Sequence, residues 1–276
     1  MDSVITLLDP YVFDPMYERV GLPQPFVSHD HWVRQLISTY LILFVGAYLM
    51  YFTGAGFSWY FFFDKNLRKD KRWLKNQELL EMGYSARAMP VMAIPMSLIF
   101  LAEIRGYSQL HENPIHGVSG WMGVAAQILA FLAFTDMLIY FIHRGLHLPW
   151  LYVRFHKPHH KWIVTSPFSS HAFHPLDGFA QALPYHIYVF MFPMNKWVYL
   201  SLFVLVNYWT ISIHDGLGVY SGEVLNGSDH HVIHHRQFNY NYGQYFTLWD
   251  KLLGTHRKPT PKNLFAAEPP RGVKEE

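Results

Sequence analysis

The chain has 276 residues, of which 51% are hydrophobic, 18% aromatic and only 15% charged, and its formal net charge is +2. Ordinary soluble domains have about 25% charged residues, so this composition favours a membrane protein. The small net charge, with no basic run beside a binding motif, argues against nucleic-acid binding. The chain has no cysteine, which excludes disulfides and thiolate metal ligands. Asp2 and the absence of a basic segment near the start argue against a cleaved signal peptide.

Four long stretches of low charge follow one another along the chain. A bilayer core is crossed by about 20 apolar residues, and three of the stretches come close to that length. The fourth, residues 178–213, has Lys196 as its only charged residue. Buried helices of a soluble protein are the alternative, which the dense aromatic residues at the ends of the stretches disfavour. The three predicted spans are 35–57, 88–104 and 121–142, with Gly54 and Gly56 expected to end or bend the first.

The distribution of basic residues predicts the orientation in the membrane. The loop after the first span carries six basic residues between Lys65 and Lys75, whereas residues 105–120 carry one. The positive-inside rule therefore places the first loop in the cytosol and the amino terminus on the lumenal side. The third span then returns to the cytosol at His143.

Histidines are concentrated in the second half of the chain, where eight of them form three boxes. The first box has the spacing HxxxH, and the second and third have HxxHH. Residues i, i+3 and i+4 share one face of a helix, so each box can direct two or three imidazoles to one point. Neutral imidazole binds iron, zinc, copper and nickel. The boxes are His143 and His147; His156, His159 and His160; and His231, His234 and His235.

The number of imidazoles predicts two metal ions. One zinc ion usually closes its site with four ligands, and eight histidines exceed that number. Adjacent histidines at i+3 and i+4 could serve neighbouring ions, one ring each. Two ions with five or six ligands would take about ten, and we expect His174 and His214 to join the boxes. His171 and His230 are weaker candidates, which would otherwise orient neighbours or face solvent.

Carboxylates near the boxes are expected to orient the histidines, because ligating imidazoles usually donate their second N–H to an acid or a carbonyl. Asp177, Asp215 and Asp229 are the candidates for this role. Asp136 lies seven residues before His143 and two helical turns deeper, where an acid is costly and usually functional. We predict Asp136 and Asp215 as catalytic residues; for Asp136 the alternative is a polar partner on a neighbouring helix.

A single metal centre requires all three boxes on one side of the membrane. Residues 183–213 should therefore form a helical hairpin that turns near Pro193, with a first arm that is short or tilted. The histidine-box region, 143–256, would form a cytosolic helical cap. The sequence thus predicts one all-α polytopic membrane domain over residues 1–276, with three spans and a hairpin. His186, outside the boxes, is expected at the surface or the membrane interface.

The order of the boxes resembles that of the fatty acid hydroxylase superfamily of membrane diiron oxidases. Within it, several segments are similar to the sterol C-5 desaturases, over a region from about Gly46 to Gly254 that includes EIRGYS at 103–108. The segments that carry this resemblance are HRGLHLPWLYVRFHKPHHKW, SPFSSHAFHPLDGFAQALPYHIY, NYWTISIHDG, NGSDHHVIHH and NYNYGQYFTLWDKLLGT.

The resemblance implies a cofactor, a reaction, redox partners and a location in the cell. It implies that the box histidines hold two iron ions, and that a Δ7-sterol is converted to a Δ5,7-sterol with O₂. Electrons would come from NADH through cytochrome b5 and its reductase, at the cytosolic face of the endoplasmic reticulum membrane. The fatty acid branch has a second histidine one turn before the position of His214, where this chain has Thr210. That difference leaves one ligand to be found, for which His174 is the candidate.

Two other functions remain open from the residues alone. A diiron hydroxylase or a sterol methyl oxidase, acting on another lipid, would use the same boxes. A histidine-rich metal transporter is disfavoured, because transporters bind near mid-membrane between repeated halves. Here the boxes lie at the ends of spans, and the sequence has no repeated halves.

Overall fold

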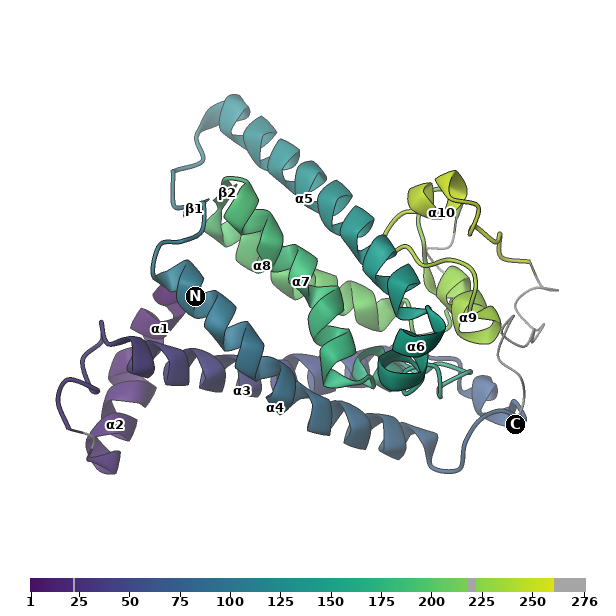
Figure 1. Cartoon of the computed structure of the whole chain (residues 1–276), viewed down its shortest axis with the longest axis horizontal. Helices are drawn as coiled ribbons and strands as arrows, with labels where there is room; N and C mark the ends of the chain where they lie inside the picture. The colour runs from purple at the N-terminus through teal and green to yellow at the C-terminus, as the bar shows by residue number, and fades with distance from the viewer. Residues whose placement is uncertain (22, 218–221, 261–276) are drawn as a thin grey trace.

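The computed structural model describes residues 1–21, 23–217 and 222–260. It is almost wholly helical (Figure 1). Within these residues, three helices have the length and composition to cross a membrane: α3 (Trp32–Phe61), α4 (Gln77–Ile104) and α5 (Gly117–Leu146). They coincide with the three predicted spans, and each begins before the predicted residue.

Two shorter helices confirm the predicted hairpin. Helices α7 (Pro175–Met191) and α8 (Lys196–Ser212) run antiparallel, with the strand β2 (Met194–Asn195) in the turn between them (Figure 1). Each helix has 17 residues, or about 25 Å at 1.5 Å per residue, which is less than the hydrocarbon thickness of a bilayer. Helix α7 begins eight residues before the predicted start, because Pro175 suits the first helical position.

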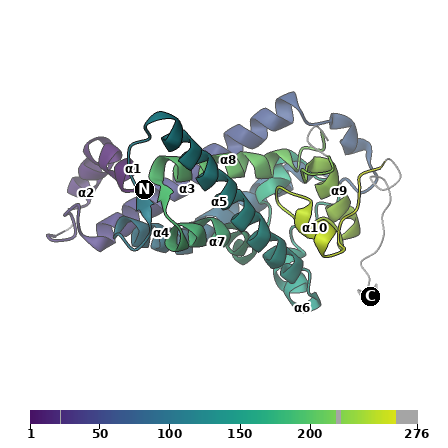
Figure 2. The same cartoon turned by 90° about the horizontal axis from the view of Figure 1, so that it is seen from above.

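The first and last elements of the chain lie at opposite ends of this bundle. Helices α1 (Asp2–Leu8) and α2 (Asp14–Val20) lie at one end, where β1 (Leu110–His111) pairs in parallel with β2. The carboxyl end of α5, together with α6, α9 and α10, lies at the other end (Figures 1 and 2). The histidine boxes are therefore gathered at one end of the bundle, as the hairpin requires. The cap helices are α6 (Pro149–Leu151), α9 (Ser228–Gln237) and α10 (Leu248–Leu252).

Four short helical segments complete the described elements. Two have π-helical and two have 3₁₀ hydrogen bonding. The π-helical segments are η1 (Asp9–Phe13) and η3 (Tyr152–His156), and the 3₁₀ segments are η2 (Lys65–Lys69) and η4 (Pro167–His171).

The first span does not end at its glycines. Helix α3 runs through Gly54 and Gly56 to Phe61, so of the two predicted roles, an end or a bend, the end is wrong. Gly54 has a different role, because a Cβ at this position would lie 2.7 Å from Cε1 of Tyr208. Glycine at residue 54 thus allows α3 and α8 to pack closely.

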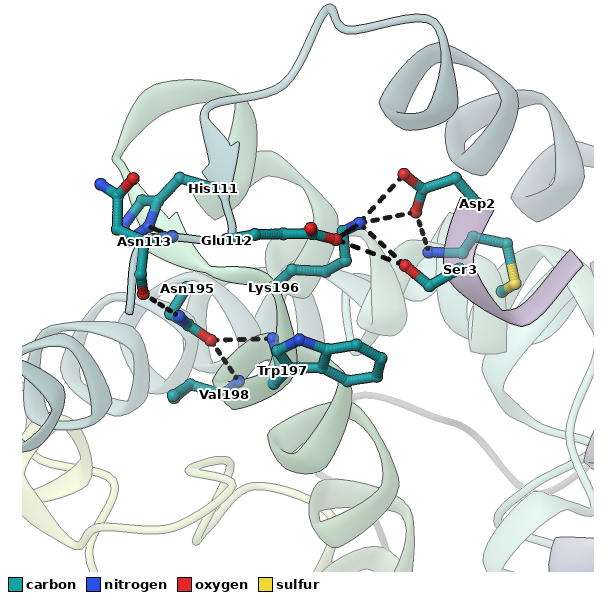
Figure 3. Close-up of polar contacts among 10 residues, drawn as sticks. Asp2, Ser3, His111, Glu112, Asn113, Asn195, Lys196, Trp197 and Val198 are labelled. Atoms are coloured by element: carbon teal, nitrogen blue, oxygen red, sulfur yellow. Dashed lines mark hydrogen bonds and ion pairs between the residues drawn. The ribbon is translucent and has the colours of Figure 1, made fainter. Parts of the chain in front are cut away.

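A polar cluster at the far end joins the amino terminus to the bundle (Figure 3). The Nζ of Lys196, at the start of α8, donates to Oδ2 of Asp2 at 3.0 Å and to Oγ of Ser3 at 3.1 Å. It also forms an ion pair with Glu112, after β1. These contacts hold α1 against the end of the hairpin.

A second polar cluster is buried inside the bundle, which sequence analysis did not predict. The ring Nδ1 of His186 lies 3.2 Å from Oε1 of Glu103 and 2.9 Å from the hydroxyl of Tyr199. The Tyr199 hydroxyl also donates to Glu103 at 3.1 Å. His186 is only 1% exposed, so its predicted surface position is wrong. The cluster ties α4, α7 and α8 together.

Candidate metal centre

Nine of the ten predicted metal-ligating histidines converge at the cap end of α5. They form two groups, and within each group the candidate ligand nitrogens all lie within 4.8 Å of one another. The five-histidine group consists of His143, His147, His156, His160 and His234, and the four-histidine group consists of His159, His214, His231 and His235.

Neighbouring histidines in the sequence belong to different groups. His159 is in the four-histidine group and His160 in the five-histidine group, and His235 and His234 are divided in the same way. Successive side chains on a helical backbone point about 100° apart, so adjacent rings reach different points. This division matches the expectation that adjacent imidazoles serve neighbouring ions.

The spacing of ring nitrogens in the five-histidine group is that of ligands around one ion. The Nε2 of His160 lies 3.1 Å from Nε2 of His156, 3.2 Å from that of His147 and 3.1 Å from that of His234. Two imidazole nitrogens about 2.1 Å from one ion and at right angles to each other are about 3 Å apart. The Nε2 atoms of this group therefore fit ligation of a single ion.

The four-histidine group has the same spacing. The Nε2 of His231 lies 3.0 Å from Nε2 of His214 and 3.0 Å from that of His235. The other nitrogen of His214, Nδ1, lies 2.7 Å from the carbonyl oxygen of Thr210, one turn earlier. A proton on Nδ1 makes this hydrogen bond and leaves the Nε2 lone pair free for a metal.

A buried carboxylate orients His156. The Nδ1 of His156 lies 2.7 Å from Oδ2 of Asp177, and the Nε2 of Gln181 donates to the other carboxylate oxygen at 2.7 Å. The predicted partnership between Asp177 and a box histidine is confirmed. Asp177 lies in the first turn of α7, so the hairpin supplies this contact.

Backbone carbonyls orient two further histidines of the five-histidine group. The Nδ1 of His143 lies 3.0 Å from the carbonyl oxygen of Tyr242, and that of His234 lies 2.8 Å from the carbonyl oxygen of Tyr240. Both acceptors belong to the segment 240–246, which we call the carbonyl loop. Sequence analysis missed this role, although NYNYGQYF was one of the segments that carried the family resemblance.

Two aspartates hold the carbonyl loop in place. Oδ1 of Asp136 accepts hydrogen bonds from three successive backbone N–H groups, those of residues 244–246, at 2.7–3.2 Å. Asp250 accepts the N–H groups of Tyr242 and Gly243, each at 2.9 Å. A Cβ on Gly243 would lie 2.5 Å from the carbonyl oxygen of Phe246, so this turn requires glycine.

The two aspartates predicted as catalytic do not touch the imidazoles. Among the described residues, the hydrogen bonds of Asp136 go to the backbone of the carbonyl loop. The same loop carries the carbonyl oxygen of Tyr242 that contacts His143. Asp215 accepts the backbone N–H of Leu217 at 2.8 Å, beside the left-handed Gly216. Burial raises the pKa of Asp215 to about 6.

His174 lies outside both groups, which corrects its prediction as the tenth ligand. Its Nδ1 accepts the backbone N–H of Leu176 at 3.2 Å, and this bond caps the start of α7. Its ring packs edge-on against Phe155, with the centroids 5.2 Å apart. The backbone N–H groups in the first turn of a helix have no partner within the helix. The ring nitrogen of His174 accepts a hydrogen bond from one of them.

The two weaker candidates also lie outside the groups. The Nε2 of His171 lies 3.3 Å from Oδ1 of Asn207. The ring of His230 is completely buried and stacks on His256, with the centroids 5.5 Å apart. The described part of the chain therefore presents nine imidazoles at the centre, not ten.

Seven of the grouped imidazoles have a lowered pKa, which favours the neutral form that metals bind. The main cause is burial, followed for most of them by repulsion between neighbouring rings. For His214 and His234 the pKa falls to about 3, with burial as the main cause. The pKa values of five others are lowered well below the usual range, those of His147, His159, His160, His231 and His235.

The four-histidine group faces a chamber that adjoins an apolar cavity. The chamber, about 100 Å³, is lined by His159, His214 and His231, together with His143 of the other group. The cavity, about 580 Å³, lies between α3, α4, α7 and α8 and falls within the size range of small-molecule sites. Six residues line both spaces: Met92, His171, Phe173, Ala182, Tyr185 and Asn207.

The cavity is long and narrow. On α3 it extends from Thr53, near the chamber, to Ile42, which corresponds to about 16 Å at 1.5 Å per residue. Met1 and Val4 of the amino-terminal segment line its far end. The cluster around Lys196 therefore holds the residues that close this cavity.

The fold and the histidine groups define a membrane oxidoreductase with histidine boxes. The fatty acid hydroxylase family model matches residues 128–255. The chain is 49% identical to the lathosterol oxidase of Homo sapiens over 263 residues, which cover 94% of this chain and 86% of that protein. It is 41% identical to a Delta(7)-sterol 5(6)-desaturase of Aspergillus fumigatus over 296 residues, covering 96% of this chain and 88% of the relative.

The chain therefore belongs to the fatty acid hydroxylase family, and within it to the group of these sterol oxidases. The lathosterol oxidase of Mus musculus is 48% identical with the same coverage. No solved structure matches the chain. The family resemblance of the boxes and of the segments between them is thus confirmed.

Proposed function

We infer that this chain is a sterol desaturase, which introduces the C5–C6 double bond into a Δ7-sterol. The observation that carries this proposal is that the chamber beside the four-histidine group adjoins a long apolar cavity, in a chain 49% identical to a lathosterol oxidase. An apolar cavity suits the ring system and side chain of a sterol, because burial of apolar surface drives binding.

Two iron ions fit the two histidine groups. The donor set is entirely imidazole, which suits iron, and the buried Nε2 of His143 has no partner among the described residues. When bound, a diiron centre supplies the reduction of O₂ and the removal of hydrogen from unactivated C–H bonds. The residues of this chain fix the rings: Asp177 orients His156, and the carbonyl loop orients His143 and His234.

The four-histidine group is the one that would meet the sterol. It has one imidazole fewer than the other group, and its rings line the chamber. Metal sites that react keep a ligand position open, whereas structural sites are closed. Thr210 also lines the chamber, at the position where the resemblance places a histidine in the fatty acid branch. A threonine there leaves room beside His214.

The partners and the location follow from the same family relationship. Electrons would come from NADH through cytochrome b5 and its reductase, at the cytosolic face of the endoplasmic reticulum membrane. The basic loop 65–75 lies at the cap end, where Asp70 forms an ion pair with Arg236 of α9. This arrangement puts the basic loop and the metal centre on the same side, and offers an acidic electron donor a complementary surface.

Expression in cells that lack sterol C-5 desaturation tests the proposal. We expect a 5,7-diene to appear in the sterol extract, identified by its ultraviolet absorption and mass, and about two irons per purified chain. A hydroxylated lipid in place of the diene would favour a hydroxylase or a sterol methyl oxidase. One zinc ion and no iron would overturn the oxidase assignment.

A further inference from the structure

Three side chains with polar atoms line both the chamber and the apolar cavity: His171 of η4, Tyr185 of α7 and Asn207 of α8. The Tyr185 hydroxyl already pairs with that of Tyr245, at 3.0 Å. The Nδ2 of Asn207 donates to the carbonyl oxygen of Phe203 at 2.6 Å, so Oδ1 is the side of the amide that faces His171, at 3.3 Å. The Nε2 of His171 therefore carries the proton and donates it to Asn207.

The other side of the ring faces Ser170. The Ser170 hydroxyl lies 2.9 Å from Nδ1 of His171 and 2.7 Å from the carbonyl oxygen of Pro167, so it can donate to either, and the tautomer is set by the contact with Asn207. The ring also packs edge-on against Tyr51, with the centroids 5.4 Å apart. These contacts hold His171 and Asn207 in one arrangement. An amide oxygen accepts two hydrogen bonds, so Oδ1 of Asn207 keeps one position for a further donor.

The chemistry of the proposed substrate requires a hydrogen-bond acceptor at this junction. A Δ7-sterol has its 3-hydroxyl on the first ring, two carbons from C5, and its alkyl side chain at the opposite end of the molecule. If C5 and C6 meet the four-histidine group, the hydroxyl must lie near the chamber and the side chain must point along the cavity. A hydroxyl buried without a partner would weaken binding strongly.

The far end of the cavity is lined mainly by apolar side chains, among them Val4, Ile42 and Leu200. Met1 also lies there, and its α-amino group pairs with Asp2 at 3.5 Å. A sterol in the reverse orientation would bury its hydroxyl among these side chains and bring saturated side-chain carbons to the metal centre. The distribution of polar groups along the cavity thus favours one orientation.

We propose that Asn207, held by His171, accepts the hydrogen bond of the sterol 3-hydroxyl and so determines which carbons face the four-histidine group. This inference rests on the proposed function. Asn207 is a specificity residue here: it binds the hydroxyl and takes no part in the redox step.

Binding of two sterols to the metal-free, full-length protein tests the inference. The probes are a 3β-hydroxy Δ7-sterol and the same sterol without the hydroxyl, and the readout is the ratio of their dissociation constants. We expect the wild type to prefer the hydroxylated sterol about tenfold, and Asn207→Leu to reduce this preference below about threefold. The affinity of the variant for the deoxy sterol reports whether its cavity is intact.

Two further variants sharpen the test. Asn207→Ala removes the amide without adding bulk, and we expect it to lose the preference as well. It provides the test if the leucine variant does not fold. Asn113→Leu makes the same change as the leucine variant at an exposed position outside the cavity and is the matched control, so we expect it to keep the wild-type preference. Folded Asn207 variants that keep a tenfold preference would overturn the inference. A wild type that makes no 5,7-diene would instead overturn the proposed function.

Discussion

The Nδ1 atom of His156 lies 2.7 Å from Oδ2 of Asp177, and both side chains are completely buried. The two residues come from different elements, since His156 ends η3 and Asp177 lies in the first turn of α7. The contact therefore makes the orientation of one imidazole depend on the docking of the hairpin.

We expect Asp177→Asn to weaken metal binding about 10- to 100-fold, because the carboxylate fixes the tautomer and the orientation of His156. Iron retained during competition with a chelator measures this effect. Asp64→Asn, which changes an exposed cap of η2, is the matched control and should retain iron as the wild type does. Equal iron retention by both variants would contradict the role assigned to Asp177.

His234 and His174 make a pair that tests the histidine groups. His234→Ala removes a ligand nitrogen of the five-histidine group and should lower the iron content and abolish desaturation. His174→Ala removes the cap of α7, so we expect both irons to remain and the stability to fall by about 1 kcal/mol. Metal analysis and thermal unfolding separate the two effects. Loss of iron in the His174 variant would restore that residue as a ligand.

Asp136 should affect the metal centre through the carbonyl loop. Asp136→Ala leaves three backbone N–H groups without their acceptor, and we expect a loss of about 1–3 kcal/mol in stability together with weaker iron binding. Asp136→Asn keeps an oxygen at this position and should lose less of both. Thermal unfolding and iron retention measure the two quantities. An alanine variant with normal iron binding would show that the loop does not depend on this residue.

The buried cluster of Glu103, His186 and Tyr199 should contribute to stability and not to chemistry. Tyr199→Phe removes one hydrogen-bonding hydroxyl and should cost about 1 kcal/mol. Glu103→Ala removes two contacts, those with His186 and with Tyr199, and leaves only the contact between these two residues, so we expect a larger loss, of about 1–3 kcal/mol. The melting temperature measures stability, and turnover per iron should stay close to that of the wild type. A large fall in turnover per iron would assign the cluster another role.

Val4 should limit the length of the sterol side chain. Val4→Phe fills the far end of the cavity, so we expect kcat/KM to fall several-fold for sterols with long side chains and little for those with short ones. Val20→Phe makes the same change on an exposed position of α2 and is the control. Equal loss for both sterols would place the end of the side chain elsewhere.

Much of the architecture could be predicted from the sequence. Runs of low charge predicted α3, α4 and α5, since about 20 apolar residues are needed to cross a bilayer. The spacing of the three boxes predicted which segments supply imidazoles to the site, and the i, i+4 pairs of each box do share a group. The need to bring the third box to the same side as the others predicted the α7–α8 hairpin. These features depend on local pattern and on the membrane, both of which a sequence expresses directly.

The tertiary structure alone decided how the imidazoles are divided and oriented. His174 has the same histidine chemistry as His214, yet it caps α7, because its ring meets the free N–H of Leu176. The carbonyl oxygens of Tyr240 and Tyr242 orient two rings. Every residue has a backbone carbonyl, so the sequence does not reveal which of them accept these hydrogen bonds. Such contacts join segments far apart in the chain, and their geometry exists only once the helices have packed.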